Sequence, residues 1–322
     1  MWRSLDCDDV FWRDLIQSQK NTTYFHDIEW ANHLRNDNWV TSRWILYEGG
    51  KPKDFLQGFI KKYPLGIGVL WFPDWVCGEL TDTKKIQNDI VQELGLNYIY
   101  IRFSSRRNFN NEDHDFLIEN HWTKPSNKFT TGLTMELKLS SKDNFKSNLK
   151  RNWRRNLKKS ENSDFSYIKI SNYEVVSKLY KEMKIIKSLS KRNIFPAEAI
   201  KSIFKNFKDK LIVIGAKDAL GNIVAIRAAI IYKKVAWDIF AATGKNSRKG
   251  GVTHGIFSAL IEECISRGCI KYDLSGIDPL NNRGVYQFKE GTGAYEKKYL
   301  GEFEWSNNKL LNFLVNFASK YR

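Results

Sequence analysis

A lysine among glycines near the C-terminus is the residue of this sequence best suited to chemistry. Phe288 and Lys289 lie in the segment Tyr272–Gly301, between expected strands at 271–274 and 297–303. Glycine permits positive φ and close approach of a backbone to a ligand, and four glycines stand here, at 276, 284, 291 and 293. The pattern predicts an exposed loop that offers the Lys289 ammonium to a substrate. A turn-rich connection with an ordinary solvated lysine fits the spacing equally well.

Three other side chains near Lys289 in sequence are candidates for a general base or for contacts with an acceptor: Asp273, Tyr286 and Glu290. A carboxylate can take a proton from an attacking ammonium if it lies within hydrogen-bonding reach. Asp273 also suits a strand-end residue that hydrogen-bonds the following loop, which is the interpretation we favour for it.

A strongly basic helix is expected at 142–159. Eight of its residues are basic and only Asp143 is acidic, so it carries seven of the chain's sixteen net positive charges. Ser140 with Asp143 resembles a capping box at its start. Its apolar residues recur at every fourth position, which predicts a buried stripe: Phe145, Leu149, Trp153 and Leu157.

The opposite side of this helix is expected to bind an anion. At 100° per residue one sector away from the apolar stripe holds four cations: Arg151, Arg154, Arg155 and Lys158. The planar donors of arginine bind phosphate bidentately. A solvated helix face is the plain alternative, and a membrane surface competes with RNA as the partner of a basic amphipathic helix.

A second candidate phosphate site is the stretch SRKGGVTHG at 247–255, which leads into an expected helix at 253–267. Glycines before a helix N-terminus leave backbone N–H groups free for an anion. Arg248 and Gly251 fit the R/Q-x-x-G-x-G/A motif of acyl-CoA-dependent acetyltransferases, but Thr253 stands where that motif has glycine or alanine. A glycine-rich helix entry without a ligand is the alternative.

The periodicity of apolar residues places these segments in an alternation of helices and strands. Further helices are expected at 8–18, 28–36, 83–94, 174–190, 198–207 and 307–321. Strands are expected at 39–47, 54–63, 70–72, 98–103, 130–139, 165–170, 210–217, 223–232 and 235–242. The two halves repeat the same order, so we predict two α/β (α+β) domains of like topology.

Length and composition support two globular domains. The chain has 322 residues, 42% of them hydrophobic, and a net charge of +16 that suits RNA, anionic lipid or phosphorylated substrates. Its four cysteines and five histidines show no metal-ligand spacing, so we expect reduced thiols and no metal site. The N-terminus lacks the apolar region of a signal peptide, and no run of 18 apolar residues occurs, which favours a cytoplasmic protein.

Three stretches together resemble the FemABX family: LKRNWRRNLKKSE, FAATGKNSRKG and YDLSGIDP…GVYQFKEGTGAYEKKYLGE, with a fainter likeness in YFHDIEWANHL. The resemblance covers most of the second half. It implies two tandem acetyltransferase-like (GNAT-like) domains with mixed central sheets, at 1–139 and 140–305, and a C-terminal helix at 306–322 that packs back on the first. The segment 174–207 is too short for the coiled-coil arm that some members carry, which leaves the peptidoglycan acceptor open.

The resemblance also implies an activity. Family members transfer an amino acid from aminoacyl-tRNA to an amine of a peptidoglycan precursor. Lys289 would then stabilise the developing oxyanion or the departing ribose oxygen, and Phe288 would shape the pocket around the tRNA acceptor stem. No cofactor is implied beyond the tRNA co-substrate. The acceptor would be a muropeptide or an amino sugar, and a lipid-linked acceptor would bring the protein to the inner face of the cytoplasmic membrane.

Two other functions remain open from the sequence. An acyl-CoA-dependent N-acyltransferase acting on a surface-polysaccharide precursor would keep the fold and use 248–253 as its pyrophosphate loop. A non-catalytic RNA- or membrane-binding protein would use only the basic helix. Neither the transferred group nor the oligomeric state follows from the sequence.

Overall fold

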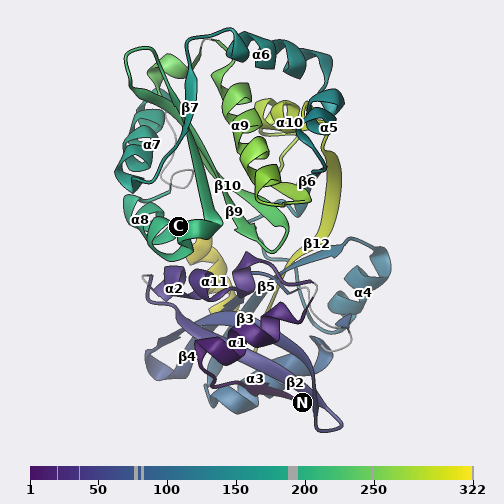
Figure 1. The fold of residues 1–322 in the computed structure, drawn as a ribbon. Helices are drawn as coiled ribbons and strands as arrows, with labels where there is room; N and C mark the ends of the chain where they lie inside the picture. The colour runs from purple at the N-terminus through teal and green to yellow at the C-terminus, as the bar shows by residue number, and fades with distance from the viewer. Residues whose placement is uncertain are drawn as a thin grey trace. The chain divides into compact units, whose positions relative to one another are not determined.

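The structure is a computed structural model that describes residues 1–19, 21–35, 37–75, 79–80, 83–187, 195–248 and 250–320. It divides the chain into two compact units (Figure 1). Unit 1 comprises Met1–Leu133 and Lys298–Arg322, and unit 2 comprises Thr134–Lys297. The C-terminal segment therefore returns to the first unit, as the resemblance to the FemABX family implies.

Unit 1 is built on a mixed sheet in the order β1-β2-β3-β4-β5-β12. Its strands are β1 (Trp2–Ser4), β2 (Val40–Glu48), β3 (Lys51–Tyr63), β4 (Ile67–Phe72), β5 (Tyr98–Asn108) and β12 (Tyr295–Ser306). β4 and β5 run parallel, and the other adjacent pairs are antiparallel. The crossover between the parallel strands contains α3, as a parallel pair requires.

Helices cover both faces of this sheet. They are α1 (Asp9–Gln17), α2 (Ile28–Arg35), α3 (Thr83–Leu94), α4 (Asn111–Glu119) and α11 (Lys309–Lys320). β3 is buried on both sides: Phe55 packs with α1 and Phe59 with α2, whereas Leu56 belongs to the core that includes α3. A strand covered on both faces is a nearly continuous apolar run, which is how this stretch appears in the sequence.

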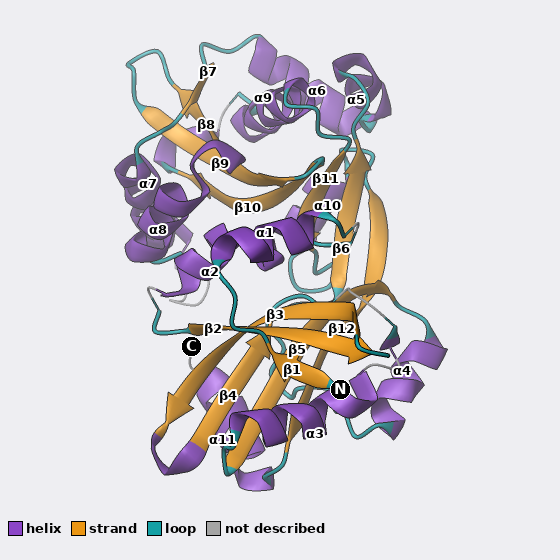
Figure 2. Ribbon diagram, turned by 60° about the horizontal axis from the view of Figure 1, so that its bottom comes forward, coloured by secondary structure: helices purple, strands orange, loops and turns teal. Residues whose placement is uncertain are grey.

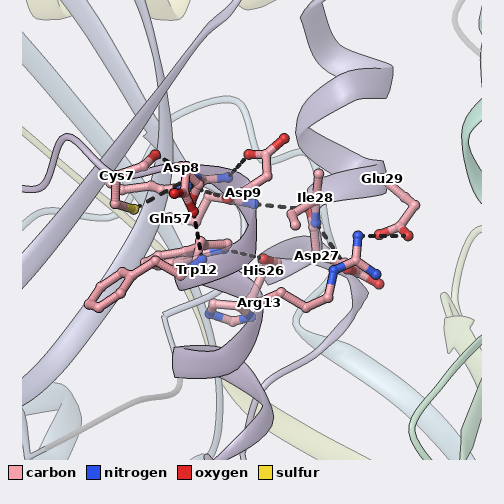
Figure 3. Close-up of polar contacts among 12 residues, drawn as sticks. Cys7, Asp8, Asp9, Trp12, Arg13, His26, Asp27, Ile28, Glu29 and Gln57 are labelled. Atoms are coloured by element: carbon pink, nitrogen blue, oxygen red, sulfur yellow. Dashed lines mark hydrogen bonds and ion pairs between the residues drawn. The ribbon is translucent and has the colours of Figure 1, made fainter.

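Polar contacts fasten the N-terminal helices of unit 1 to its sheet (Figure 3). Trp12 Nε1 donates to His26 O at 2.8 Å, and Gln57 Nε2 on β3 donates to Asp27 O at 3.2 Å. An ion pair between Arg13 and Glu29, at 3.6 Å, links α1 to α2. The Trp12 and Gln57 donors thereby have partners, which removes the cost of burying them unpaired.

Unit 2 repeats the same topology in the order β6-β11-β10-β9-β8-β7. Its strands are β6 (Leu133–Lys138), β7 (Ser166–Lys169), β8 (Leu211–Lys217), β9 (Ile223–Tyr232), β10 (Val235–Thr243) and β11 (Lys271–Gly276). β10 and β11 are parallel and are joined through α9. The remaining adjacent pairs are antiparallel.

The helices of unit 2 lie on opposite faces of its sheet (Figure 2). They are α5 (Lys142–Asn148), α6 (Arg151–Glu161), α7 (Tyr173–Lys187), α8 (Ala197–Phe207), α9 (Val252–Ser266) and α10 (Arg283–Glu290). α9 packs on β8 and β9 and also supports α5 and α6, whereas α7 and α8 pack on β8, β9 and β10. The fold is thus α/β, with two units that share a mixed-sheet plan.

The structure corrects three details of the predicted elements. The basic helix is two helices, because Leu149 is extended (ψ 136°) and Lys150 N donates to Gly291 O at 2.9 Å. Its N-cap is Ser141, whose hydroxyl accepts from Asn144 N, and not Ser140. β1, α4 and α10 were not anticipated.

Two expectations from composition can be compared with the described part of the chain. Cys7, Cys264 and Cys269 are free thiols there, and Cys77 lies outside the described residues. None of the described helices is long and apolar enough to cross a membrane.

Candidate active site

A cavity in unit 2 opens where the parallel strands β10 and β11 part. The two strands pair from Val235–Lys271 to Trp237–Asp273 and then separate, with a bulge in β10 between Asp238 and Phe240. The cavity has a volume of about 720 Å³. It is lined by the second half of β10, by Ser275, by the start of α9, by α10 and by α7. Both Phe288 and Lys289 line it.

Lys289 is a buried helical residue, so the expectation of an exposed loop lysine is wrong. It lies in the last turn of α10 and is 5% exposed. Its Nζ donates to Gly276 O at 2.8 Å and to Ser275 O at 3.2 Å. Burial lowers the pKa of Lys289 to about 8, although the Asp238 carboxylate acts in the opposite direction. The group therefore stays mostly charged at neutral pH but gives up its proton easily.

The turn that holds the two carbonyls depends on Ser275 and not on the glycines. Ser275 has φ 62°, a conformation that costs a non-glycine residue energy. Its Oγ donates to Asp238 O at 2.6 Å, and its backbone N donates to Asp273 Oδ1 at 2.8 Å. Of the four glycines noted in the sequence, Gly293 alone has positive φ. The surrounding hydrogen bonds thus aim the carbonyls at Lys289.

An ion pair that the sequence interpretation missed lies beside Lys289. Arg227 on β9 donates from Nε and Nη2 to the two oxygens of Asp238, at 2.9 and 2.7 Å. Tyr272 OH donates to Asp238 Oδ1 at 2.9 Å. The guanidinium also packs 4.8 Å from the Phe257 ring centroid and 5.1 Å from that of Phe288. Asp238 is therefore held in a fixed position at the cavity wall.

A signal for this pair was present in the sequence. Arg227 interrupts the apolar strand IVAIRAAIIY, and Asp238 interrupts VAWDIFAAT on the next strand. Charged side chains are seldom buried unless they are paired. Two opposite charges inside adjacent apolar strands would have predicted a buried salt bridge.

An aromatic cluster holds Phe288 in place. Trp153 from α6 donates its Nε1 to Phe288 O at 3.1 Å, and its ring lies 5.7 Å from the Phe288 ring. His254 at the start of α9 packs edge-on to both rings, at 4.7 and 5.2 Å. Burial lowers the pKa of His254 to about 4. The imidazole is therefore neutral at pH 7 and adds no charge near Lys289.

The side of the cavity away from Lys289 is apolar. Tyr180 and Met183 of α7, Phe195 and Phe240 line it. The rings of Tyr180, Phe195 and Phe240 pack against one another with centroids 5.9 to 6.2 Å apart. The cavity thus offers a cation at one end and a large apolar surface at the other, as sites for small organic groups commonly do.

The three sequence candidates for a base or an acceptor contact are bonded to other protein groups, although the Asp273 carboxylate still acts to raise the pKa of Lys289. Asp273 is 2% exposed and accepts from Thr134 Oγ1 as well as from Ser275 N, so it acts as the strand-end hydrogen-bond acceptor. Tyr286 OH is hydrogen-bonded to Glu296, and Glu290 accepts from Lys150 Nζ at 2.6 Å. None of the three is among the residues that line the cavity in the described chain.

The basic face of α6 is exposed. Arg151, Arg154, Arg155 and Lys158 all point to solvent, while Trp153 and Leu157 are buried. The apolar stripe is therefore confirmed on both sides of the helix break, since Phe145 and Leu149 are buried as well. The four cations form a surface that we call the α6 basic face.

The glycines before α9 allow close packing of helices. A Cβ on Gly251 (φ 69°) would lie 2.2 Å from Asn156 O of α6. One on Gly255 would lie 2.0 Å from Ser160 Oγ and from Tyr167 OH. Gly251 thus serves as an αL N-cap against α6, and α6 takes up space beside the α9 N-terminus. The side chain of Arg248, the other sequence candidate here, lies outside what the structure describes.

Within the described residues, no group of three or more His, Cys, Asp or Glu side chains could hold a metal ion. The groups that the cavity offers are an ammonium of lowered pKa, an ion pair and an apolar wall.

Comparison with known proteins places this geometry in context. Residues 216–320, which contain the cavity strands and α10, match the model of the FemAB family. No curated protein matches the sequence. Among solved structures, FemX is similar over 98% of this chain and 100% of its own, with a TM-score of 0.78 and 13% identity.

Two further solved structures have the same fold. A tandem GNAT protein from the clavulanic acid biosynthesis pathway has a TM-score of 0.59 at 10% identity, over 96% of this chain and 98% of its own. L-PGS from Bacillus licheniformis has a TM-score of 0.54 at 12% identity, over 96% of each chain. These likenesses confirm the predicted tandem GNAT-like fold.

Proposed function

We propose that this chain, whose residues 216–320 match the FemAB family model and whose fold is similar to that of FemX, is an aminoacyltransferase. Family and fold support an acyltransferase of the peptidoglycan-related class. The finer proposal is that the donor is aminoacyl-tRNA and that the acceptor is an amine of a muropeptide or of an amino sugar, with no cofactor beyond the tRNA.

The proposal rests chiefly on the buried, charged Lys289 at the wall of the cavity. In aminoacyl transfer the acceptor amine attacks the ester carbonyl, which forms a C–N bond and places negative charge on the carbonyl oxygen. The C–O bond to the ribose then breaks, and the ribose oxygen takes up a proton. A preorganised ammonium stabilises the charge that develops, more strongly in a site of low dielectric constant than in water.

The lowered pKa of Lys289 suits both halves of this reaction. With a pKa of about 8 the ammonium is the main form at neutral pH, so it is available to the oxyanion. Its proton is also easier to lose than that of an ordinary lysine, which matches transfer to the departing ribose oxygen. The attacking amine must be neutral, and we assign no residue as its base.

The α6 basic face supports a polyanionic donor. Its four exposed cations lie on the helix whose Trp153 hydrogen-bonds the backbone of Phe288. We propose that the tRNA acceptor stem lies on this face. Phosphate contacts of this kind contribute affinity and make binding depend on salt.

The donor can be tested directly. The purified chain is incubated with a radiolabelled aminoacylated RNA acceptor-stem helix and, separately, with acetyl-CoA, each with an amino sugar or muropeptide acceptor. We expect amide formation from the RNA ester only. Saturable use of acetyl-CoA with no use of the RNA ester would favour the acyl-CoA alternative, although the packing of α6 against Gly251 counts against a pyrophosphate site there.

The basic face can be tested separately with a matched control. Changing Arg151, Arg154, Arg155 and Lys158 to Gln should weaken binding of the RNA helix and reduce the slope of log K against log salt by about 3. The control changes four exposed lysines of α7 and α8 to Gln: Lys178, Lys181, Lys184 and Lys205. Equal slopes in the two variants would show that the RNA binds elsewhere.

A further inference from the structure

An apolar stripe on helix α11 of unit 1 faces solvent. The stripe consists of Leu310, Phe313, Leu314 and Phe317, which are 65%, 65%, 51% and 53% exposed. Their spacing of three and four residues puts them within about 100° of the helix circumference. The Phe313 and Phe317 rings are stacked, with centroids 6.2 Å apart. An amphipathic helix normally buries such a stripe, and the sequence led us to expect that here.

The opposite side of α11 holds the helix on unit 1. Leu311 is 8% exposed, and Asn316 Nδ2 donates to both carboxylate oxygens of Glu304 on β12 at 2.9 Å. Ser319 Oγ accepts from Asn127 Nδ2 at 3.1 Å. One side of α11 is therefore fixed to unit 1 by packing and hydrogen bonds, and the apolar side is exposed to solvent.

The charges around the stripe are positive. α11 contains no acidic residue, and its lysines Lys309 and Lys320 lie on the same edge of the stripe. Phenylalanine and leucine in the centre with lysine at the border is the pattern of a helix that lies in a membrane interface.

We propose that α11 binds the surface of a membrane containing anionic lipids, with the stripe inserted at the boundary of headgroups and acyl chains. The size of the stripe favours lipid over a second copy of the chain. Its four side chains expose on the order of 400 Å², whereas a stable dimer needs roughly 800 Å² from each partner. Shallow insertion needs no partner surface of matching shape, and lysines at the border add attraction to anionic headgroups.

The test is vesicle flotation with the full chain. We expect the protein to float with vesicles of phosphatidylglycerol and phosphatidylcholine in equal parts, and less with phosphatidylcholine alone. The double variant Phe313→Ser, Phe317→Ser should bind anionic vesicles at least about tenfold more weakly. The matched control is Phe11→Ser, since Phe11 of α1 is also 53% exposed and belongs to the same unit. It should bind as the wild type does.

Three results would overturn the proposal: no flotation of the wild type, equal loss in the control, or equal flotation of the double variant. If the wild type is instead a dimer by light scattering, does not float, and becomes a monomer when Phe313 and Phe317 are replaced, the stripe is a self-association surface. Circular dichroism and thermal unfolding of each variant show that it is folded. No outcome depends on acyl transfer, so the proposed function is tested independently of this one.

Discussion

The substitution Lys289→Met tests the central residue of the proposed site. Methionine keeps most of the aliphatic length and removes the ammonium. If Lys289 stabilises the oxyanion, the variant should lose on the order of 100- to 1,000-fold in turnover, the usual effect of deleting one donor to a developing charge. The measurement is the single-turnover rate of amide formation with the aminoacylated RNA helix.

The expected effect on stability is small because two terms oppose each other. A fall in the pKa of Lys289 from 10.5 to about 8 means that burial of the charge costs roughly 3 kcal/mol at neutral pH, and methionine removes that cost. The variant also leaves Ser275 O and Gly276 O without their donor, a loss of about 1–3 kcal/mol. The free energy of unfolding should therefore change by less than about 2 kcal/mol.

The dependence of stability on pH separates these terms. Between pH 8 and 10.5 the unfolded chain keeps the Lys289 proton while the folded chain releases it. The unfolded state then binds more protons, so this group makes the wild type more stable as pH rises through that window. Urea unfolding at about pH 7 and about pH 10 should show a gain for the wild type relative to Lys289→Met of roughly 3 kcal/mol.

Two controls make the result decisive. Lys178→Met, at an exposed position on α7, should show neither the loss of turnover nor the difference in pH slope. If Lys289→Met and the wild type have the same pH slope, the pKa of Lys289 is not lowered and the burial argument is wrong. If turnover is unchanged, the ammonium does not act on the oxyanion, whatever the stability.

Three further substitutions test the supports of the site. Asp238→Asn removes the charge that pairs with buried Arg227. The free energy of unfolding measured in urea should fall by about 3 kcal/mol. An unchanged free energy would mean that the pair is not buried in solution. Gly255→Ala places a Cβ 2.0 Å from Tyr167 OH. The clash should lower the stability measured by thermal unfolding by about 1–3 kcal/mol. A variant with the melting temperature of the wild type would show that no such clash exists. Trp153→Phe keeps an aromatic ring but loses the hydrogen bond to the backbone of α10. We expect the variant to be less stable by about 1 kcal/mol and to turn over more slowly. Normal turnover would show that this hydrogen bond does not position the site.

The strands and most helices could be predicted because their signal is local. Apolar periodicity located every described strand except β1, with limits within about five residues, and gave α3 its observed limits, Thr83–Leu94. The break between α5 and α6 had no such signal. Its cause is the hydrogen bond from Lys150 N to Gly291 O, a partner 141 positions away in the chain (291 − 150), and the apolar spacing continues across it unchanged.

The candidate site could also be predicted only where its signal is local in the sequence. Phe288 and Lys289 were identified through their sequence setting, but their place on a helix was not. α10 is only eight residues long, and glycines at 284 and 291 made it read as a loop. The Gly291 position is explained by packing, since a Cβ there would lie 2.6 Å from the Trp153 ring. Burial of Lys289 depends on the carbonyls of the Ser275 turn and could not follow from local pattern.

The α6 basic face, which we propose binds the RNA, and the side of α6 that packs on α10 belong to one helix. Variants of α6 can therefore affect either RNA binding or the position of Lys289. The charged face of α6 reaches solvent, whereas Trp153 bonds the backbone of Phe288 in α10. Lys150, the N-cap of α6, bonds the Glu290 side chain of α10 and the backbone of Gly291. Neutralising the charges should therefore change RNA affinity and salt dependence while the rate with bound donor stays near normal. Changing the packed side chains should do the reverse, because they set where Lys289 is held. A variant of the charged face that lowered the single-turnover rate at saturating RNA would mean that donor binding itself shifts α10.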